Sequence, residues 1–315
     1  MTAAGPVVLT GATGFIGRRI QAALCEAGYT LRAIVRPGSR NRRRIDPRCE
    51  PVECALGDDR GLAAALASAG AVVYCAGRVR GGSLDDFLPA NVDGVKAVLR
   101  ALAQAENSPP VLLISSLAAG RPQLSDYARS KSLGEAALQE HASGPWTILR
   151  PPAVYGPGDR EMRAVLSMVR RGIIVHAGPR DQRVALLHVD DLAAAVTAWL
   201  GAWRSCRGST YAIDDGRPGA YDWSAMAAAA GHARYRRLRI PAGLLSALGH
   251  CNLMFSQLTG RAPMLTPGKV RELTEAAWLC DNSAFAAATG WGPQIDLAAG
   301  LDGAVSETFN RDPSR

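Results

Sequence analysis

The cysteines of this sequence lack the spacing of a structural framework. Seven cysteines in 315 residues form an odd, scattered set, without a Cys-x-x-Cys pair or a zinc-type histidine spacing. We therefore expect neither a disulfide framework nor a metal site. Reduced thiols and a cytoplasmic location are the prediction that follows.

Long apolar runs are also missing. No uncharged stretch reaches the ~18 residues that a bilayer-spanning helix needs. The longest candidate, residues 240–258, is broken by Pro241, His250 and Asn252. No basic segment or signal-type apolar run precedes the first apolar strand, so export is not expected. Attachment to a membrane surface stays compatible with this pattern.

Lysine is nearly absent, since 3 lysines stand beside 33 arginines. The net charge of +8 therefore reflects a compositional preference as much as an anionic partner, and we do not expect nucleic acid to bind. Hydrophobic residues at 48% and charged residues at 20% are ordinary for a folded enzyme. The length allows one large core or two coupled lobes.

What is present is a regular alternation of short apolar runs with helical segments, which predicts a doubly wound parallel α/β sheet. The runs of strand length are residues 7–9, 30–35, 52–56, 71–75, 111–114 and 146–149. We predict a Rossmann domain that binds NAD(P) over residues 1–155, to which residues 185–215 return. Residues 156–184 and 216–315 are expected to form a smaller substrate-binding lobe.

A glycine-spaced turn follows the first predicted strand. Gly11, Gly14 and Gly17 stand where the chain passes into the first helix, so its backbone can approach a pyrophosphate that the helix N-terminus stabilises. Arg36 follows the second strand, at the position where an NAD-selective site places an acid on the ribose 2′-hydroxyl. An arginine there suits a 2′-phosphate, so NADP is predicted over NAD.

Small and polar residues follow the next two strands. Asp58, after the third strand, can accept a hydrogen bond from the adenine amino group. Cys75, Ala76 and Gly77, after the fourth, leave room for the ribose and phosphates of a dinucleotide.

Tyr127 and Lys131 are spaced so that both side chains meet on one face of a helix. A free tyrosine has a pKa of about 10, and a neighbouring ammonium together with an oxidised nicotinamide is expected to lower it. Tyr127 then serves as an acid or base, and Lys131 is expected to hydrogen-bond the nicotinamide ribose. A serine hydroxyl should donate to the substrate oxygen.

The order of these motifs resembles the extended short-chain dehydrogenase/reductase family along most of the chain. Its matching segments are residues 10–17, 57–58, 91–94, 115–116, 127–131, 150–158 and 188–193. The resemblance implies a catalytic serine at Ser116, with Ser115 as the alternative, and a homodimer. The cofactor contacts predicted from the sequence and the resemblance together are Gly11, Thr13, Gly14, Phe15, Ile16, Gly17, Arg36, Asp58, Cys75, Ala76, Gly77, Asn91, Lys131, Pro151 and Val154.

His188, Asp190 and Asp191 invite a catalytic interpretation, but the resemblance places them at a structural junction. A lone histidine beside an apolar run is usually buried and satisfied, and the adjacent carboxylates fit a helix N-cap. Asn91 is expected to hold a helix bend near the site.

The second lobe offers an apolar helix over residues 241–255 in place of obvious sugar or phosphate ligands, which favours an apolar substrate. Its order resembles the 3β-hydroxysteroid dehydrogenase and dihydroflavonol reductase relatives. Met254, Phe255 and Leu258 have the spacing of core packing or of a substrate pocket. The preceding basic residues fit either contact with anionic lipid or a charged strand edge, and they are Arg234, Arg236, Arg237 and Arg239.

Three functions remain open at this point. The first is an NADP-dependent oxidoreductase that acts on a lipophilic alcohol or ketone. The second is a nucleotide-sugar epimerase or dehydratase, which would keep NAD tightly bound between turnovers. The third is a non-enzymatic NAD(P)-binding sensor or assembly subunit, which would need no proton donor. The intact Tyr127 and Lys131 favour an enzyme.

Overall fold

A parallel seven-stranded sheet forms the centre of the molecule. The computed structural model describes residues 5–105, 108–259, 262–263 and 265–306. In spatial order the strands are β3 (Glu50–Glu53), β2 (Leu31–Val35), β1 (Val7–Thr10), β4 (Ala71–Tyr74), β5 (Val111–Ile114), β6 (Trp146–Arg150) and β11 (Ser209–Ala212). This arrangement confirms the predicted doubly wound α/β fold. The strand order reverses between β1 and β4, and ligands of such sheets bind at the carboxyl ends of the strands there.

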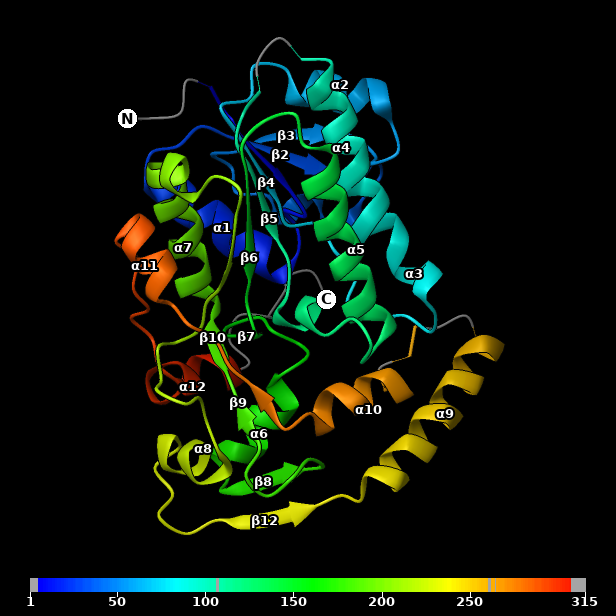
Figure 1. Cartoon of the computed structure of the whole chain (residues 1–315), viewed down its shortest axis with the longest axis vertical. Coiled ribbons are helices and arrows are strands. Elements are labelled where there is room, and N and C mark those ends of the chain that lie inside the picture. The colour runs from blue at the N-terminus through cyan, green and yellow to red at the C-terminus, as the bar shows by residue number, and fades with distance from the viewer. Residues whose placement is uncertain (1–4, 106–107, 260–261, 264, 307–315) are drawn as a thin grey trace.

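Helices cover both faces of this sheet (Figure 1). One face carries α1 (Phe15–Glu26) and α7 (Val189–Ala202), which pack against each other. The other face carries α2 (Asp59–Leu66), α4 (Gly94–Ala103) and α5 (Asp126–His141). The segment 185–215, predicted to return to this part of the chain, supplies α7 and β11.

The central strands are apolar throughout because helices bury both of their faces. In β1, Val7 and Leu9 join the core beneath α1 and α7, whereas Val8 points the other way into the core beneath α4. All three are fully buried. This explains why continuous apolar runs, without alternation, marked the strands in the sequence.

The remaining elements form a smaller lobe at the carboxyl edge of the sheet (Figure 1). Its strands form parallel pairs, namely β7 (Ala153–Tyr155) with β10 (Leu186–His188), β8 (Ile173–His176) with β12 (Arg236–Arg239), and β9 (Arg183–Val184) with β13 (Ala277–Trp278). Its helices are α6 (Arg163–Arg170), α8 (Trp223–Ala229), α9 (Ala242–Thr259), α10 (Pro267–Thr274) and α12 (Leu297–Val305). Tyr155, Tyr221 and Leu301 belong to a separate hydrophobic core beneath them. Further short elements are α3 (Leu84–Leu88), the π-helical turn Pro89–Asp93, α11 (Ser283–Thr289) and 3-10 turns at Arg40–Arg44, Leu117–Gly120 and Trp203–Cys206.

The start of α7 differs from the prediction. His188, not an aspartate, is the N-cap, and its Nδ1 accepts from the backbone N–H of Asp190 at 3.3 Å. Asp190 instead pairs with Arg19 of α1 at 2.9 Å. Asp191 is buried and accepts from the backbone N–H of Ile295 at 2.9 Å. The carboxylates join distant segments, so the predicted aspartate cap is wrong, while the buried, structural His188 is as expected.

Helix α9 also departs from the sequence prediction. Met254, Phe255 and Leu258 are 66%, 61% and 85% exposed, so they are not core packing. Only one side of α9 contacts the protein, and Gly249 on that side lies against α10. Across the described residues, the structure contains no helix with both the length and the apolar character needed to traverse a bilayer.

Candidate active site

The glycine loop brings β1 close to β4. Gly11 has a φ of +68°, and a Cβ at this position would lie 2.6 Å from the backbone nitrogen of Ala76. A Cβ on Gly17 would lie 2.2 Å from the carbonyl oxygen of Gly11. Only glycine fits these positions, because the loop, β4 and the first turn of α1 touch through backbone atoms.

The N-terminus of α1 is suited to an anion. Gly14 is the N-cap, no side chain caps the helix, and its first turn carries no acid. The first backbone N–H groups and the positive end of the helix dipole therefore point toward the crevice without a protein acceptor of the usual capping kind. Thr13, Phe15 and Ile16 lie half-buried in this same loop.

The end of β4 closes the other side of the crevice. Thr10 Oγ1 accepts hydrogen bonds from the backbone N–H groups of Cys75 and Ala76, both at 3.1 Å, which ties β1 to β4 at the switch point. Burial raises the pKa of the Cys75 thiol to about 12. The thiol is therefore neutral, and Gly77 beyond it is exposed.

The two residues predicted to contact the adenosine half of the cofactor have different surroundings. Arg36 is exposed immediately after β2, as expected. Asp58 is the N-cap of α2 and accepts from the backbone N–H of Gly61 at 3.0 Å. A local capping role therefore accounts for Asp58 without a ligand.

Arg18 is a cationic residue that the sequence motifs did not indicate. Its Nε is buried and has no hydrogen-bond partner among the described residues. Burial lowers the pKa of Arg18, and the charges of Arg44, Arg19 and Arg160 lower it further. A buried guanidinium among like charges fits an anionic ligand such as a dinucleotide pyrophosphate. Its position in the sequence, directly after Gly17 of the glycine turn, could have indicated this role.

The two candidate serines have different partners. Ser116 accepts from the backbone N–H of Ala118 at 3.2 Å, and it lies close enough to Tyr127 to oppose the rise in that tyrosine's pKa. Ser115 is buried and donates to Glu135, whose carboxylate also binds Arg150. The structure thus brings Ser116, and not Ser115, to Tyr127.

Lys131 lies one turn beyond Tyr127 on α5. Its side chain is buried, and Nζ donates to the carbonyl oxygen of Ile114 at 2.8 Å. Burial lowers the pKa of Lys131 to about 8, because the charged ammonium loses its water. The carbonyl anchor fixes this ammonium at the end of β5.

The pKa of Tyr127 is raised in the chain alone. Burial raises it to about 12, the nearby Ser116 lowers it, and the charge of Glu272 raises it further. The predicted lowering depends on the Lys131 ammonium together with an oxidised nicotinamide, whereas in the chain alone desolvation of the phenolate is the largest contribution. The protein by itself therefore holds Tyr127 as a protonated hydroxyl.

Glu272 is a second residue that the motifs did not indicate. It lies on α10 and is buried, where it accepts from Ser125 Oγ and pairs with Lys269 Nζ at 2.8 Å. Ser125 caps α5 two residues before Tyr127. Glu272 thus links the second lobe to the helix that carries the tyrosine.

Asn91 lies in the π-helical turn between α3 and α4. Its Nδ2 donates to Ser130 Oγ at 2.8 Å and to the carbonyl oxygen of Arg78 at 3.1 Å, and its Oδ1 accepts from the backbone N–H of Arg78 at 2.9 Å. All three of these hydrogen bonds join Asn91 to other residues of the chain. Asn91 therefore joins the helix bend to α5 beside Lys131.

Two predicted cofactor contacts, Pro151 and Val154, lie in the segment 150–158 that matches the family. The carbonyl oxygen of Pro151 accepts from the backbone N–H of Leu117 at 2.8 Å, next to Ser116. Val154 is half-buried within β7, which pairs with β10. This segment therefore lies on the same edge of the sheet as the serine and the tyrosine.

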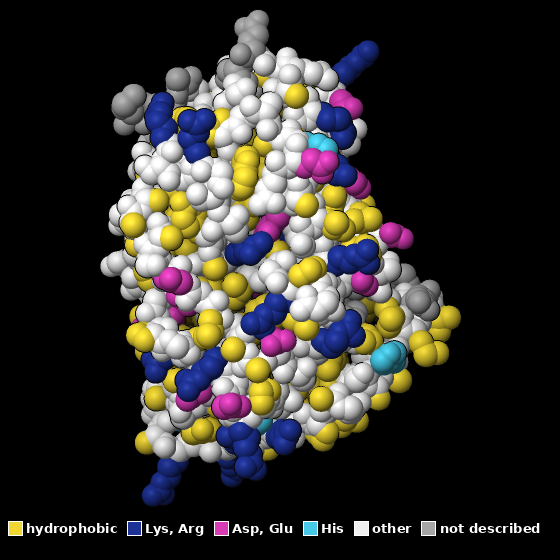
Figure 2. All heavy atoms as spheres, viewed as in Figure 1, with side chains coloured by type: hydrophobic (Ala, Val, Ile, Leu, Met, Phe, Trp, Pro, Cys, Tyr) yellow, Lys and Arg dark blue, Asp and Glu magenta, His cyan; other side chains and the backbone are white. Residues whose placement is uncertain are grey.

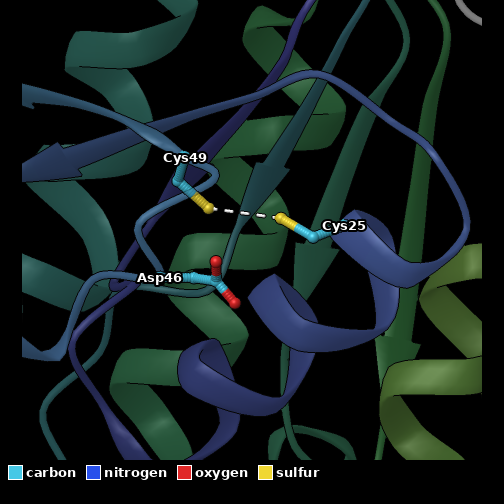
Figure 3. A group of neighbouring side chains, drawn as sticks. All are labelled: Cys25, Asp46 and Cys49. Carbon is cyan, nitrogen blue, oxygen red and sulfur yellow. Dashed lines mark hydrogen bonds between the residues drawn. The ribbon is translucent and has the colours of Figure 1, made fainter.

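A different cluster lies at the opposite edge of the sheet. Cys25, in the last turn of α1, and Cys49, just before β3, place their sulfurs 3.5 Å apart, with Asp46 beside them (Figure 3). Arg48 binds the carboxylate and lowers the pKa of Asp46 to about 2. Burial raises the pKa of Cys49 to about 12. A neutral thiol and a carboxylate held by a guanidinium are poor metal ligands, and we assign this cluster no part in the chemistry.

Comparisons with known proteins agree with this geometry. Residues 7–213 match the family model described as the NAD dependent epimerase/dehydratase family. The chain is 34% identical to the ceramide reductase of Caulobacter vibrioides over 291 residues, covering 90% of this chain and 89% of the relative. It is 28% identical to the dihydroflavonol 4-reductase of Hordeum vulgare, covering 61% and 66% of the two chains.

A solved structure shares the whole fold. The UDP-glucuronic acid 4-epimerase of Bacillus cereus, in complex with UDP-glucuronic acid and NAD, superposes with a TM-score of 0.67 at 18% identity, covering 96% of this chain and 98% of the other. The chain therefore belongs to the NAD dependent epimerase/dehydratase family and is an NAD(P)-dependent enzyme of the extended short-chain dehydrogenase/reductase type.

Proposed function

We propose that this chain is an NADP-dependent reductase that interconverts a ketone and an alcohol on a lipophilic substrate. The observation that carries the chemistry is that Ser116 lies close enough to Tyr127 to lower its pKa, with the buried Lys131 one helical turn away on α5. These hydroxyl groups lie at the carboxyl edge of the sheet, on the side of the switch point where a dinucleotide fits.

The proposed preference for NADP rests on arginines. Arg36 stands at the end of β2, and Arg18 and Arg44 are close enough for their charges to repel. The pyrophosphate of a dinucleotide would relieve that repulsion, and a 2′-phosphate beside Arg36 would accept charge-assisted hydrogen bonds. NADP, when bound, supplies or accepts the hydride.

The residues of the chain manage the proton and the substrate oxygen. Ser116 Oγ is proposed to donate to the carbonyl oxygen as negative charge develops on it. Tyr127 Oη is proposed to transfer its proton to that oxygen, for which a raised pKa keeps the proton in place near neutral pH. Lys131 Nζ, anchored on the carbonyl oxygen of Ile114, provides a fixed positive charge one helical turn beyond the tyrosine.

The substrate class is supported by the similarity to ceramide reductase and by the second lobe. Ceramide reductase matches nearly the whole chain at 34% identity, which supports a ceramide-like lipid. Helix α9 contributes Leu253 to the side facing the loop at Gly82, where a Cβ would lie 3.1 Å from Leu253 Cδ1. Apolar side chains near the site suit a hydrocarbon chain better than a nucleotide sugar.

Release of the bound nucleotide followed by turnover tests this proposal. The denatured protein should release little nucleotide, and the native protein should oxidise NADPH faster than NADH in the presence of a long-chain keto-ceramide analogue. Near-stoichiometric NAD in the purified protein, without net oxidation of NADPH, would instead support the epimerase or dehydratase. A chain that binds NADPH but reduces no ketone would support the sensor.

The predicted cytoplasmic location and homodimer stay proposals. Fractionation of cells that express the chain at its natural level, and sedimentation of the purified protein, would measure the two separately.

A further inference from the structure

One segment of the second lobe has an unusual charge composition. From Trp223 to Arg271 the sequence contains no Asp or Glu, although it carries six arginines and one lysine. The whole chain has 28 acidic residues in 315, so a gap of this length is not an effect of general scarcity. The segment includes α8, β12, α9 and most of α10. It presents a surface of positive charge without neutralising carboxylates of its own.

Within this segment, α9 exposes an apolar stripe. Leu244, Leu248, Phe255 and Leu258 are 54%, 51%, 61% and 85% exposed. Together with the exposed Cys251 they recur every three or four residues, so they lie on one face of the helix. We call these five residues the α9 stripe. Figure 2 shows hydrophobic side chains along the edge of the molecule where α9 lies.

Strand β12 adds arginines at the N-terminal end of the stripe. All four of its residues are exposed, and it pairs only with β8 among the described strands. A pocket of about 430 Å³ beside it is lined by Arg171, Arg234 and Arg236 together with His232. Figure 2 shows Lys and Arg side chains gathered at this end of the molecule. A hollow lined by guanidinium groups has the chemistry of a site for an anionic headgroup.

We propose that the α9 stripe and the arginines around β12 form a docking surface for an anionic lipid bilayer. The apolar side chains would enter the interface of the bilayer, and the guanidinium groups would contact lipid phosphates. A basic strand that leads directly into an apolar helical face, with no acid between them in the sequence, is the arrangement that such a surface requires.

The docking surface continues to the active site. The inner side of α9 places Leu253 against Gly82, and a Cβ on the neighbouring Gly81 would lie 2.9 Å from the ring of Phe87. The Phe87 ring meets Tyr127 edge-on, with ring centroids 6.0 Å apart. Leu253 and Phe87 therefore place apolar side chains between α9 and the catalytic tyrosine, next to the carboxylate of Asp86, and a lipid that leaves the bilayer along α9 would approach the tyrosine there.

The opposing interpretations account for less of this surface. Charge on an exposed edge strand prevents edge-to-edge pairing, which explains β12 but not the α9 stripe. A second copy of the chain could cover the stripe, but it would bring one acid-free segment against another. Repulsion between their arginines opposes that contact, whereas an anionic bilayer complements both features.

Co-sedimentation of the full chain with vesicles tests the docking surface independently of catalysis. The protein should bind vesicles of phosphatidylcholine with phosphatidylglycerol, and not vesicles of phosphatidylcholine alone. High salt should weaken this binding, because it screens the arginines. Arg234→Gln with Arg236→Gln should weaken binding by about fivefold for each charge. Leu248→Gln with Phe255→Gln should weaken it by about tenfold or more.

Matched controls distinguish this surface from general stickiness. Leu279→Gln removes a leucine that is 51% exposed, as Leu248 is, but lies outside α9. Arg60→Gln with Arg207→Gln removes two exposed charges elsewhere. Both controls should bind vesicles as the natural chain does. The proposal is overturned by absence of vesicle binding, by control variants that lose as much affinity, or by a stripe variant that only converts a dimer to a monomer.

Substrate delivery is the part that rests on the proposed function. For a long-chain ketone held in vesicles, the stripe variant should raise KM, while KM for a short, dissolved ketone stays unchanged. If no ketone is reduced, the proposed function fails, and the vesicle measurement still decides the docking surface. If the stripe variant and the natural chain have the same KM for the vesicle-held ketone, delivery through α9 is wrong.

Discussion

Helices α5 and α9 invert the usual placement of side chains in opposite ways. Helix α5, 16 residues long, buries the polar Ser130, Lys131 and Glu135. Helix α9, 18 residues long, exposes Leu248 and Phe255. Burying polar groups and exposing large apolar ones both cost free energy, so each inversion indicates a constraint other than stability.

The difference lies in where the compensating partners are. Each buried polar group of α5 has a partner within the chain, such as Asn91 for Ser130 and Ile114 for Lys131. The α9 stripe has no comparable cover within the part of the chain that the structure describes. The polar groups of α5 are therefore satisfied within the chain, whereas the α9 stripe is uncovered among the described residues and would be covered by the bilayer that we propose.

The largest expected effect comes from removing the hydroxyl of α5 that carries the proton. Tyr127→Phe should lower the single-turnover rate of ketone reduction by about 10²–10⁴-fold, since general acid catalysis contributes that much. Nucleotide binding, measured by fluorescence titration, should stay as in the natural chain. The thermal unfolding midpoint should also change little.

The matched control is Tyr29→Phe, because Tyr29 is half-buried beyond the end of α1, away from the site. It should keep the full rate. If Tyr127→Phe also kept it, α5 would carry no acid, and the contrast with α9 would reduce to one of packing.

The next effect separates two adjacent serines. Ser116→Ala should lower the turnover rate by about 10²–10³-fold, the usual cost of removing one donor to a developing oxyanion. Ser115→Ala should instead leave the rate nearly unchanged and lower the free energy of unfolding by about 1 kcal/mol, because it loses the hydrogen bond to Glu135. Rates and urea unfolding of both variants measure this contrast. The opposite assignment of the two effects would make Ser115 the catalytic serine.

A smaller effect concerns arginines, which we propose to bind the nucleotide at the active site and lipid phosphates at the docking surface. Arg36→Gln should raise KM for NADPH by about 10–100-fold with little change for NADH, since hydrogen bonds to a charged group contribute about 1.5–3 kcal/mol. Arg60→Gln, an exposed arginine on α2, serves as the control and should leave both values unchanged. Equal losses for the two nucleotides would mean that Arg36 does not distinguish them.

The features that the sequence predicted are local ones. The glycine turn, the apolar strands and the Tyr127–Lys131 pair depend on spacings of a few residues, and their geometry follows from strand and helix periodicity. The catalytic role of Ser116 stays a prediction, and the structure places this residue locally, as the N-cap of the 3-10 turn Leu117–Gly120 that follows β5.

The features that the sequence did not predict depend on contacts between distant segments. Glu272 lies near Tyr127 because α10 folds back onto the start of α5, where Ser125 is 147 residues earlier in the chain. The exposure of Phe255 could not be predicted either, since helical spacing is the same on a buried and an exposed face. The balance of burial and charge that raises the pKa of Tyr127 is likewise a property of the assembled site.

The smallest effect tests whether the two lobes are electrostatically coupled. Glu272 lies on the second lobe, and its negative charge opposes formation of the Tyr127 phenolate. Glu272→Gln removes that charge, so the pKa of Tyr127 should fall. In the reduction direction the rate depends on the protonated hydroxyl and is lost as the pH rises through this pKa. The loss should therefore begin at a lower pH in the variant, with less than about a tenfold change in rate at any one pH.

Glu275→Gln is the control for this shift. Glu275 lies three residues further along, at the end of α10, and pairs with Arg121 at 2.7 Å. Glu275→Gln should leave the pH profile of ketone reduction unchanged, although this substitution removes the same charge from the same region. A shift of equal size in both variants would indicate a long-range field, and no shift in either would show that the second lobe shapes the site through packing alone. A shift confined to Glu272→Gln would mean that the lobe which faces the substrate also tunes the acid on α5.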